Sequence, residues 1–162
     1  RIIGWDEILE GGLAPDATVM SWRGTEGGMK AIAEGHDVIF TPTHFCYFDY
    51  QQDSTQYRPV GRHLPLEKVY SFAPIVKGIS EEDAHHVLGV QGNLWTEWVM
   101  EPWHAEMMLY PRVFAIAETG WTPAKKKNWI EFERRASVLS KVARDWGYNV
   151  FVKPMTNVGQ KP

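Results

Sequence analysis

The stretch DATVMSWRGTEGGMKAIAEGHDVIFTPT, residues 16–43, decides the fold class. It begins with a β-prone run that ends in Trp22. It continues in a helix-like segment with Met29, Ile32 and Ala33 at helical spacing, and it closes with the apolar run DVIFTPT. A strand, a helix and a second strand in this order form the repeating unit of a parallel sheet. The stretch therefore predicts an α/β protein.

The same alternation extends on both sides of this unit. RIIGW (1–5) is a short apolar run, and the acidic, helix-like DEILEGG follows it. HVLGVQGNLW (86–95) is the fourth strand pattern, after a long loop that begins at His44. PWHAEMMLYPRVFAIAETGW predicts a helix in two pieces, with Pro111 starting the second piece. Short Val/Ile/Leu runs are typical of parallel strands that are buried on both faces.

The last segment predicts one long helix. Asn128 and Glu131 resemble a capping box at its start, and Gly147 is a typical residue for its end. Apolar residues recur at spacings of three and four, so we expect them in the core. They are Trp129, Phe132, Ala136, Leu139, Val142 and Trp146.

Composition excludes several classes of function. The chain has 162 residues and a net charge of −3, whereas nucleic-acid binding requires a basic patch. No apolar stretch approaches the roughly 20 residues that a membrane span requires. The single cysteine, Cys46, excludes an internal disulfide, and neither a metal-binding His spacing nor a G-x-G-x-x-G cofactor loop occurs. We therefore expect no nucleic-acid partner, no membrane span, no metal and no cofactor.

Aromatic residues mark the ends of the predicted strands. Trp5, Trp22 and Trp95 each end a strand pattern, and the remaining strand leads into HFCYFDY, which contains Tyr47. In α/β barrels and in open α/β sheets, active sites form at the carboxyl ends of the strands. These side chains are therefore the first candidates for a site.

The fourth strand pattern passes directly into a polar and aromatic cluster. A strand that only fills a core is expected to end in turn residues. Here GVQGNLWTEW brings Gln91, Asn93, Trp95, Glu97 and Trp98 within eight positions. This composition predicts that the segment grips a ligand.

Five motifs in order now identify a family resemblance. IGWDEIL, SWRG, YFDY, GNLWTEW and YPRVFAIAETGW resemble the family 20 glycoside hydrolases, the β-N-acetylhexosaminidases. The resemblance covers nearly the whole chain and implies a TIM (β/α)8 barrel. Residues 1–162 would form the C-terminal part of the catalytic domain, as half of a barrel with parallel strands five to eight and their helices. A complete barrel requires about 250 residues.

The resemblance implies a pocket for the 2-acetamido group of a sugar. Trp5, Trp22 and Trp95 would form its walls, and Tyr47 would act in catalysis as the donor to the acetamido oxygen. In this family the acetamido oxygen of the substrate attacks the anomeric carbon, so the enzyme supplies no nucleophile. The implied reaction is exo-hydrolysis of terminal N-acetylhexosamine residues from glycans, with retention of configuration.

The resemblance assigns carboxylates to two different tasks. Asp49 and Glu97 would bind the sugar hydroxyls around O4 and O6. The Asp-Glu pair that supplies the acid in this family follows the fourth strand, and no such stretch occurs here. Asp6 and Glu7 follow the fifth-strand motif instead, where the dipole of a helix favours acidic residues in the first turn.

Further expectations follow from an acid pair that lies outside this chain. The isolated piece should be inactive, and its exposed strand edges should make it self-associate. The alternatives are a non-catalytic carbohydrate-binding module and a structural half-barrel. Segment 50–79, with Tyr57, Arg58 and Tyr70, is a candidate cover for the pocket mouth. Family relatives are often periplasmic, extracellular or lysosomal, which favours an exported protein.

Overall fold

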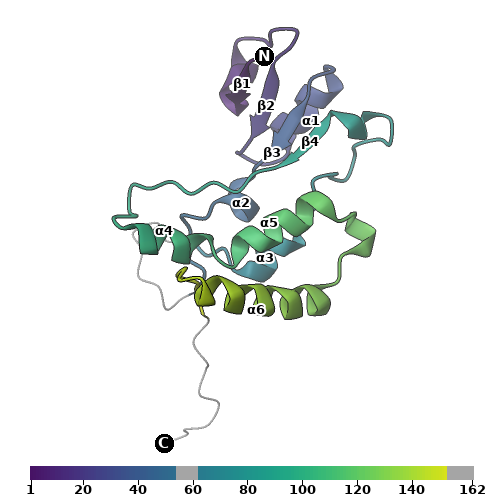
Figure 1. Ribbon diagram of the computed structural model, residues 1–162. Coiled ribbons are helices and arrows are strands. Elements are labelled where there is room, and N and C mark those ends of the chain that lie inside the picture. The colour runs from purple at the N-terminus through teal and green to yellow at the C-terminus, as the bar shows by residue number, and fades with distance from the viewer. Residues whose placement is uncertain (54–61, 153–162) are drawn as a thin grey trace, which may run out of the picture.

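The chain forms one four-stranded parallel sheet (Figure 1). A computed structural model describes residues 1–53 and 62–152. The strands are β1 (Ile3–Trp5), β2 (Thr18–Ser21), β3 (Val38–Phe40) and β4 (Val87–Val90). They lie in the order β1-β2-β3-β4, and every neighbouring pair is parallel. A doubly wound sheet reverses its order at a switch point, whereas this order runs in one direction, as it does in a barrel.

Helices occupy the connections between the strands. Helix α1 (Glu26–Ala33) follows β2. Between β3 and β4 lie α2 (Thr43–Cys46), α3 (Leu66–Ser71) and the 3-10 helix η2 (Asp83–His86). After β4 come α4 (Pro102–Leu109), α5 (Arg112–Trp121), the 3-10 helix η3 (Ala124–Lys126) and α6 (Trp129–Asp145). The acidic segment after β1 is a 3-10 helix, η1 (Asp6–Glu10). Within residues 1–53 and 62–152, none of these helices is both long enough and apolar enough to cross a membrane.

The long loop predicted after β3 contains regular structure, and in this respect the prediction is wrong. Helices α2 and α3 each follow a proline with extended backbone, Pro42 and Pro65. Proline is tolerated there because the first N–H groups of a helix have no partner within the helix. Both helices are too short to show the apolar periodicity that predicts a helix.

One hydrophobic cluster packs α1 against the sheet. Val19, Val38 and Phe40 of the strands are fully buried beside Ile32 of α1. A Cβ atom added at Gly28 would lie 2.4 Å from the ring of Phe40. This glycine therefore allows the helix to approach the sheet closely, which explains one glycine of the GTEGG stretch.

A second cluster fixes the segment that follows β3. Phe48 and Tyr50 of this segment are buried beside Tyr70 of α3 and Phe132 of α6. The rings of Tyr70 and Phe132 stack with their centres 4.3 Å apart. Figure 1 shows α3, α5 and α6 as a layer below the sheet. The aromatic segment therefore joins the sheet to this helical layer.

The ends of α6 follow the sequence prediction. The Asn128 side chain accepts a hydrogen bond from the Glu131 N–H at 3.2 Å, as an N-cap residue does. Gly147 has a φ of 90°, which favours glycine, and its N–H bonds to the Arg144 carbonyl at 2.9 Å. Capping residues therefore located both ends of this helix correctly.

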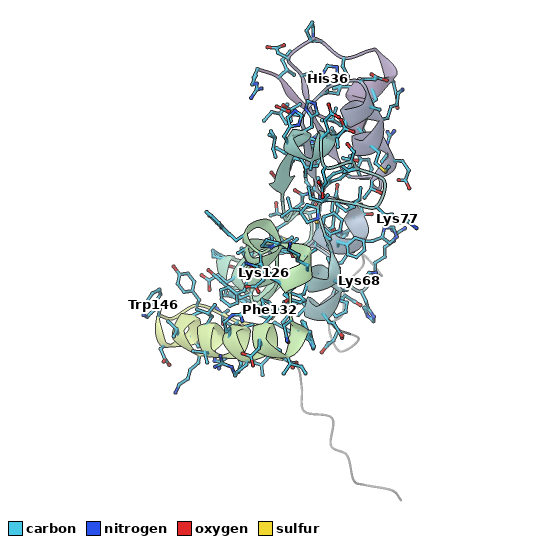
Figure 2. All side chains as sticks on the ribbon, turned by 90° about the vertical axis from the view of Figure 1, so that its right-hand side faces the viewer. His36, Lys68, Lys77, Lys126, Phe132 and Trp146 are labelled. Carbon is cyan, nitrogen blue, oxygen red and sulfur yellow. The ribbon has the colours of Figure 1, made fainter. Side chains whose placement is uncertain are left out.

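The apolar stripe of α6 is buried only in its first half. Phe132 and Ala136 lie in the second cluster, but Leu139, Val142 and Trp146 are exposed, so the core prediction is wrong for these three. Figure 2 shows Trp146 pointing away from the body of the molecule at the far end of the helix. Periodicity identifies the residues that share a face, but it does not say how far the neighbouring elements extend along that face.

Candidate active site

The strands and the segments after them surround one cavity of about 580 Å³. Side chains from all four strand ends line it. They are Trp5, Glu7, Trp22, Tyr47, Asp49, Trp95, Glu97 and Trp98. The six residues that the sequence analysis selected all belong to this set. Trp98, which belongs to the segment predicted to grip a ligand, also lines the cavity. Glu7 lines it as well and was not selected for a pocket role.

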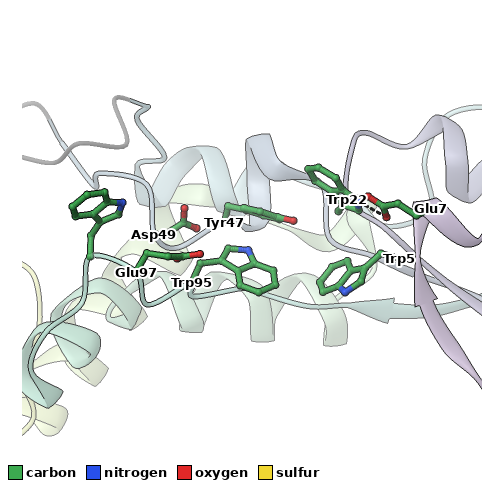
Figure 3. A pocket seen from close by; sticks show the side chains of 8 residues that line it. Trp5, Glu7, Trp22, Tyr47, Asp49, Trp95 and Glu97 are labelled. Atoms are coloured by element: carbon green, nitrogen blue, oxygen red, sulfur yellow. Dashed lines mark hydrogen bonds between the residues drawn. The ribbon is translucent and has the colours of Figure 1, made fainter.

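Four aromatic rings form a continuous wall (Figure 3). The rings of Trp5 and Trp95 have their centres 5.8 Å apart, and Trp95 lies 6.3 Å from Tyr47. Trp22 stacks on Tyr47 at 6.3 Å with 25° between the ring planes. These separations are within the range of favourable aromatic pairs. The hydroxyl of Tyr47 points toward Trp22 and Trp5, into the space that the indoles surround.

Tyr47 has the properties of a permanent hydrogen-bond donor. Its side chain is buried, and burial raises the pKa of its hydroxyl to about 12, with a smaller contribution from the charge of Asp49. The phenol is therefore protonated at neutral pH. A protonated phenol can donate to a carbonyl oxygen that enters the indole-lined space.

The other end of the cavity carries two carboxylates. Figure 3 shows Asp49 and Glu97 on the side of Trp95 away from Trp5. One carboxylate oxygen of Asp49, Oδ1, is buried and has no hydrogen-bond partner among the described residues. Burial, and then the charge of Glu97, raises the pKa of Asp49. A buried acceptor without a partner is costly, so this oxygen is suited to a hydroxyl donor on a ligand.

A buried arginine holds the segment that carries Tyr47 and Asp49. Arg112 of α5 has no exposed surface, and its guanidinium donates to the carbonyls of Phe48 at 2.6 Å and Tyr50 at 2.9 Å. Burial lowers the pKa of Arg112, while the charge of Asp49 opposes this change. Hydrogen bonds to charged groups are stronger than neutral ones. The arginine of the YPR stretch therefore fixes the backbone on both sides of Asp49.

The backbone at Trp22 rests on a buried carboxylate. Asp6 accepts hydrogen bonds from the N–H groups of Trp22 at 2.8 Å and Arg23 at 2.9 Å. A Cβ atom at Gly27 would lie 2.1 Å from Asp6 Oδ1, so glycine makes room for this carboxylate. Asp6 is in the first turn of η1, as predicted, and its side chain also joins η1 to the end of β2.

The indole of Trp22 has its own partner. Glu7 accepts a hydrogen bond from Trp22 Nε1 at 3.2 Å, and its other oxygen accepts one from Arg23 at 3.0 Å. The Arg23 guanidinium lies 5.5 Å from the centre of the Trp22 ring. Sequence reasoning placed Glu7 only in a helix turn. Its position two residues after Trp5, at the end of β1, was the signal that it reaches the pocket.

Gln91 and Asn93 do not line the cavity, in contrast to the predicted gripping role. Gln91 donates to Asn93 Oδ1 at 2.6 Å, and Asn93 donates in turn to the hydroxyl of Thr41. Thr41 donates to the carbonyl of Gln91 at 2.9 Å. This closed network ties the end of β4 to the end of β3 and thereby positions the segment that carries Trp95.

Two remaining expectations concern the mouth of the pocket and metal binding. Two of the candidate cover residues, Tyr57 and Arg58, lie outside the described residues. The third, Tyr70, is buried in the second cluster and does not line the cavity, so the cover prediction is wrong for this residue. Among residues 1–53 and 62–152, no group of three His, Cys, Asp or Glu side chains is arranged to hold a metal ion.

The lining of the cavity offers aromatic surface, one phenol donor and carboxylate acceptors. These groups suit a neutral polar ligand such as a sugar.

Comparison with known proteins identifies the family. Residues 1–124 match the model of the glycosyl hydrolase family 20 catalytic domain. The chain belongs to glycoside hydrolase family 20. A β-hexosaminidase of Porphyromonas gingivalis is 48% identical over 138 residues, which are 83% of this chain and 18% of that protein. A β-hexosaminidase of Akkermansia muciniphila is 32% identical over 136 residues, or 81% of this chain and 27% of that protein.

Solved structures of family 20 enzymes share the fold. The exo-β-N-acetylglucosaminidase of Vibrio harveyi, crystallised with N-acetylglucosamine, superimposes with a TM-score of 0.86 at 27% identity. The match covers 96% of this chain and 25% of that structure. The parallel α/β sheet thus matches part of the TIM barrel of family 20. The chain spans about a fifth to a quarter of the length of these relatives.

Proposed function

We propose that this chain is the C-terminal part of the catalytic barrel of a β-N-acetylhexosaminidase. In this proposal β1 to β4 are barrel strands five to eight, and the enzyme removes terminal N-acetylhexosamine residues from glycans. The observation that carries the proposal is the single cavity in which three indoles surround the hydroxyl of Tyr47. The names of the family 20 relatives support the same activity.

The aromatic wall suits a mechanism in which the substrate supplies the nucleophile. Family 20 is a recognised exception to the two-carboxylate scheme of glycosidases. The indoles of Trp5, Trp22 and Trp95 would enclose the acetamido group, and burial of its methyl contributes about 0.8 kcal/mol. Holding the acetamido oxygen in line with the anomeric carbon has a larger effect, since a well-oriented intramolecular attack lowers the barrier by up to about 7–11 kcal/mol.

Tyr47 would assist this attack directly. Its protonated hydroxyl points into the indole-lined space, where it can donate to the acetamido oxygen. The donor orients this oxygen toward the anomeric carbon as the cyclic intermediate forms. Preorganised donors of this kind stabilise the charge that develops in the transition state.

The carboxylate end of the cavity would bind the hydroxyls of the same sugar. Asp49 and Glu97 would accept from the hydroxyls around O4 and O6, and each charge-assisted hydrogen bond contributes about 1.5–3 kcal/mol. The partnerless oxygen of Asp49 supports this assignment, because a sugar hydroxyl would supply its missing donor. Recognition of these hydroxyls suits an enzyme that takes terminal residues.

The proton donor to the leaving group would come from a part of the protein outside this chain. Asp6 and Glu7 already hold the backbone and the indole of Trp22. We therefore expect the isolated 162-residue piece to be inactive. We also expect it to self-associate through its sheet edges, where Ile3 on β1 and Leu88 on β4 are exposed.

The decisive experiment compares two proteins on two substrates. The complete protein, meaning this chain together with the rest of the barrel, is incubated with the nitrophenyl β-glycosides of N-acetylglucosamine and of glucose. We expect hydrolysis of the first with retention and a rate at least about 10³-fold lower for the second, which lacks the acetamido nucleophile. The isolated piece should release no nitrophenol.

Three results would contradict parts of this proposal. Equal turnover of both substrates would exclude the acetamido group as the nucleophile. Binding of N-acetylglucosamine by the complete protein without hydrolysis would favour a carbohydrate-binding module instead. Release of nitrophenol by the isolated piece would place the acid within these 162 residues.

A further inference from the structure

We propose that Glu7 is a positioning residue that fixes the tilt of the Trp22 indole and thereby sets the size of the N-acyl group that the pocket accepts. Glu7 acts together with Arg23, and we call these two residues the bracket. The inference rests on the proposed function and deepens it, because it assigns an N-acyl selectivity to one wall of the same cavity.

The bracket contacts the indole on its edge and beside one face. Glu7 accepts from Trp22 Nε1 at 3.2 Å, as the dashed line in Figure 3 shows. The guanidinium of Arg23 lies 5.5 Å from the centre of the ring and is bonded to Glu7 at 3.0 Å. The indole also stacks on Tyr47 at 6.3 Å. An acceptor, a cation and a stacked ring therefore define one orientation of the indole.

The backbone does not fix this orientation by itself. Asp6 holds the main-chain N–H of Trp22, which leaves rotation about the side-chain bonds of the indole unrestrained. Trp22 is only half-buried, so packing does not enclose it completely. An indole nitrogen can only donate, and Glu7 is the acceptor that the structure gives it. Loss of this acceptor would release the ring on its solvent side.

The charge of Glu7 suits this task. Hydrogen bonding to the backbone at Glu7 lowers the pKa of its carboxyl, and the Trp22 indole and Arg23 lower it further. The side chain is therefore an acceptor throughout the neutral range. A general acid requires the opposite, a raised pKa that keeps its proton at neutral pH. Glu7 is thus suited to hold the Trp22 indole in place and not to donate a proton.

A movable Trp22 would affect reactivity and selectivity together. The acetamido methyl faces the indoles, and the acetamido oxygen must be directed at the anomeric carbon. A shift of 1 Å in such a geometry can lower the rate about 10²-fold. A wall that tilts outward also leaves room for one more methylene. Turnover of the N-acetyl substrate should therefore fall while turnover of an N-propionyl substrate falls less.

Three variants of the complete protein separate the bracket from general effects. Glu7→Ala removes the acceptor, and Glu7→Gln keeps an amide oxygen that can accept from the indole. Glu10→Ala is the matched control, because Glu10 pairs with Arg23 at 3.2 Å and makes no hydrogen bond to Trp22. Each variant is assayed with nitrophenyl β-glycosides that carry either an N-acetyl or an N-propionyl group.

For Glu7→Ala we expect kcat on the N-acetyl substrate to fall about tenfold, with a smaller change in KM. Its preference for N-acetyl over N-propionyl should fall about fivefold, which is within the effect of one methylene on discrimination. Glu7→Gln and Glu10→Ala should each keep the preference of the unaltered protein for N-acetyl over N-propionyl. Their kcat should stay within about fivefold of that of the unaltered protein, because each loses only one exposed ion pair.

Different outcomes would overturn different claims. An unchanged N-acyl preference in Glu7→Ala would reject the positioning role, even if kcat falls. Complete loss of turnover in Glu7→Gln would also reject it and would indicate a proton-transfer role. No turnover of either substrate by the unaltered protein would reject the proposed function, and this inference with it.

Discussion

The two ends of the cavity are supported in opposite ways. The segment that carries Tyr47 and Asp49 rests on Arg112, whose side chain has no exposed surface. The indole of Trp22 rests on Glu7 and Arg23, whose side chains are 49% and 52% exposed. One support is part of the core, and the other lies at the surface.

The two supports should therefore differ in how much their loss destabilises the fold. Removal of a buried donor leaves carbonyls unsatisfied, and each one costs about 1–3 kcal/mol. An exposed ion pair contributes less than about 1 kcal/mol. Tyr47 and Asp49, on the segment that Arg112 holds, are therefore coupled to global stability. The indole wall can change its tilt with little effect on the fold.

Replacement of Arg112 tests the buried support and should have the largest effect. We expect Arg112→Met to destabilise the barrel by roughly 3–5 kcal/mol, because carbonyls such as those of Phe48 and Tyr50 lose a charged donor. Arg112→Lys keeps the charge and should lose about half as much. Thermal unfolding of the complete protein measures both changes.

The surface support supplies the control for this prediction. Arg23→Met removes a cation of the same type from the bracket and should leave the melting temperature nearly unchanged. Equal losses of stability at Arg112 and Arg23 would show that burial does not distinguish the two supports.

Removal of the Tyr47 hydroxyl tests the role of a side chain on the segment that Arg112 holds in place. Tyr47→Phe should lower kcat about 10²–10³-fold, by analogy with the loss of an oxyanion-hole donor. The ring remains, so the stacking on Trp22 and the fold should be preserved. Steady-state kinetics and a melting curve together check this prediction. Unchanged turnover would remove Tyr47 from the mechanism.

The carboxylate beside the phenol should show a characteristic pH dependence. Burial raises the pKa of Asp49, so the folded state binds its proton more tightly than the unfolded state does. Stability therefore falls as pH rises from the unfolded value, about 3.9, through the raised pKa. Asp49→Asn removes this loss, so its melting temperature should exceed that of the unaltered protein at pH 7 and converge with it below about pH 4.

Activity should change in the opposite direction. In the proposed function Asp49 accepts a charge-assisted hydrogen bond from the sugar, which Asp49→Asn would lose. The kcat/KM of this variant should therefore fall about 10–100-fold at pH 7. The deficit should shrink as the pH is lowered through the raised pKa, because the unaltered protein then loses the same charge. A deficit that is constant over the whole pH range would mean that Asp49 binds substrate without using its charge.

The same contrast explains what the sequence could predict. Short apolar runs located the strands, helical spacing located most of the helices, and the strand ends located Trp5, Trp22 and Trp95. The supports escaped prediction because their partners are distant in sequence. The carbonyl of Phe48 lies 64 positions from Arg112, and Glu7 lies 15 positions from Trp22. Local patterns report which face a residue occupies, but not which backbone group it meets.

A substitution at the start of helix α6 should have the smallest effect on activity. It serves as a reference for how far a loss of stability alone changes kcat. Asn128→Ala removes the N-cap bond to the Glu131 N–H and should cost about 1 kcal/mol of stability. Phe132, one turn into the helix, packs on Tyr70 in the same buried cluster as Phe48 and Tyr50. Loss of the cap therefore weakens the core around the buried support without changing any residue of the cavity. We expect a lower melting temperature with an unchanged kcat and an unchanged N-acyl preference. A fall in kcat would mean that global stability by itself affects the geometry around Tyr47. The losses of activity in the other variants would then need correction for their losses of stability.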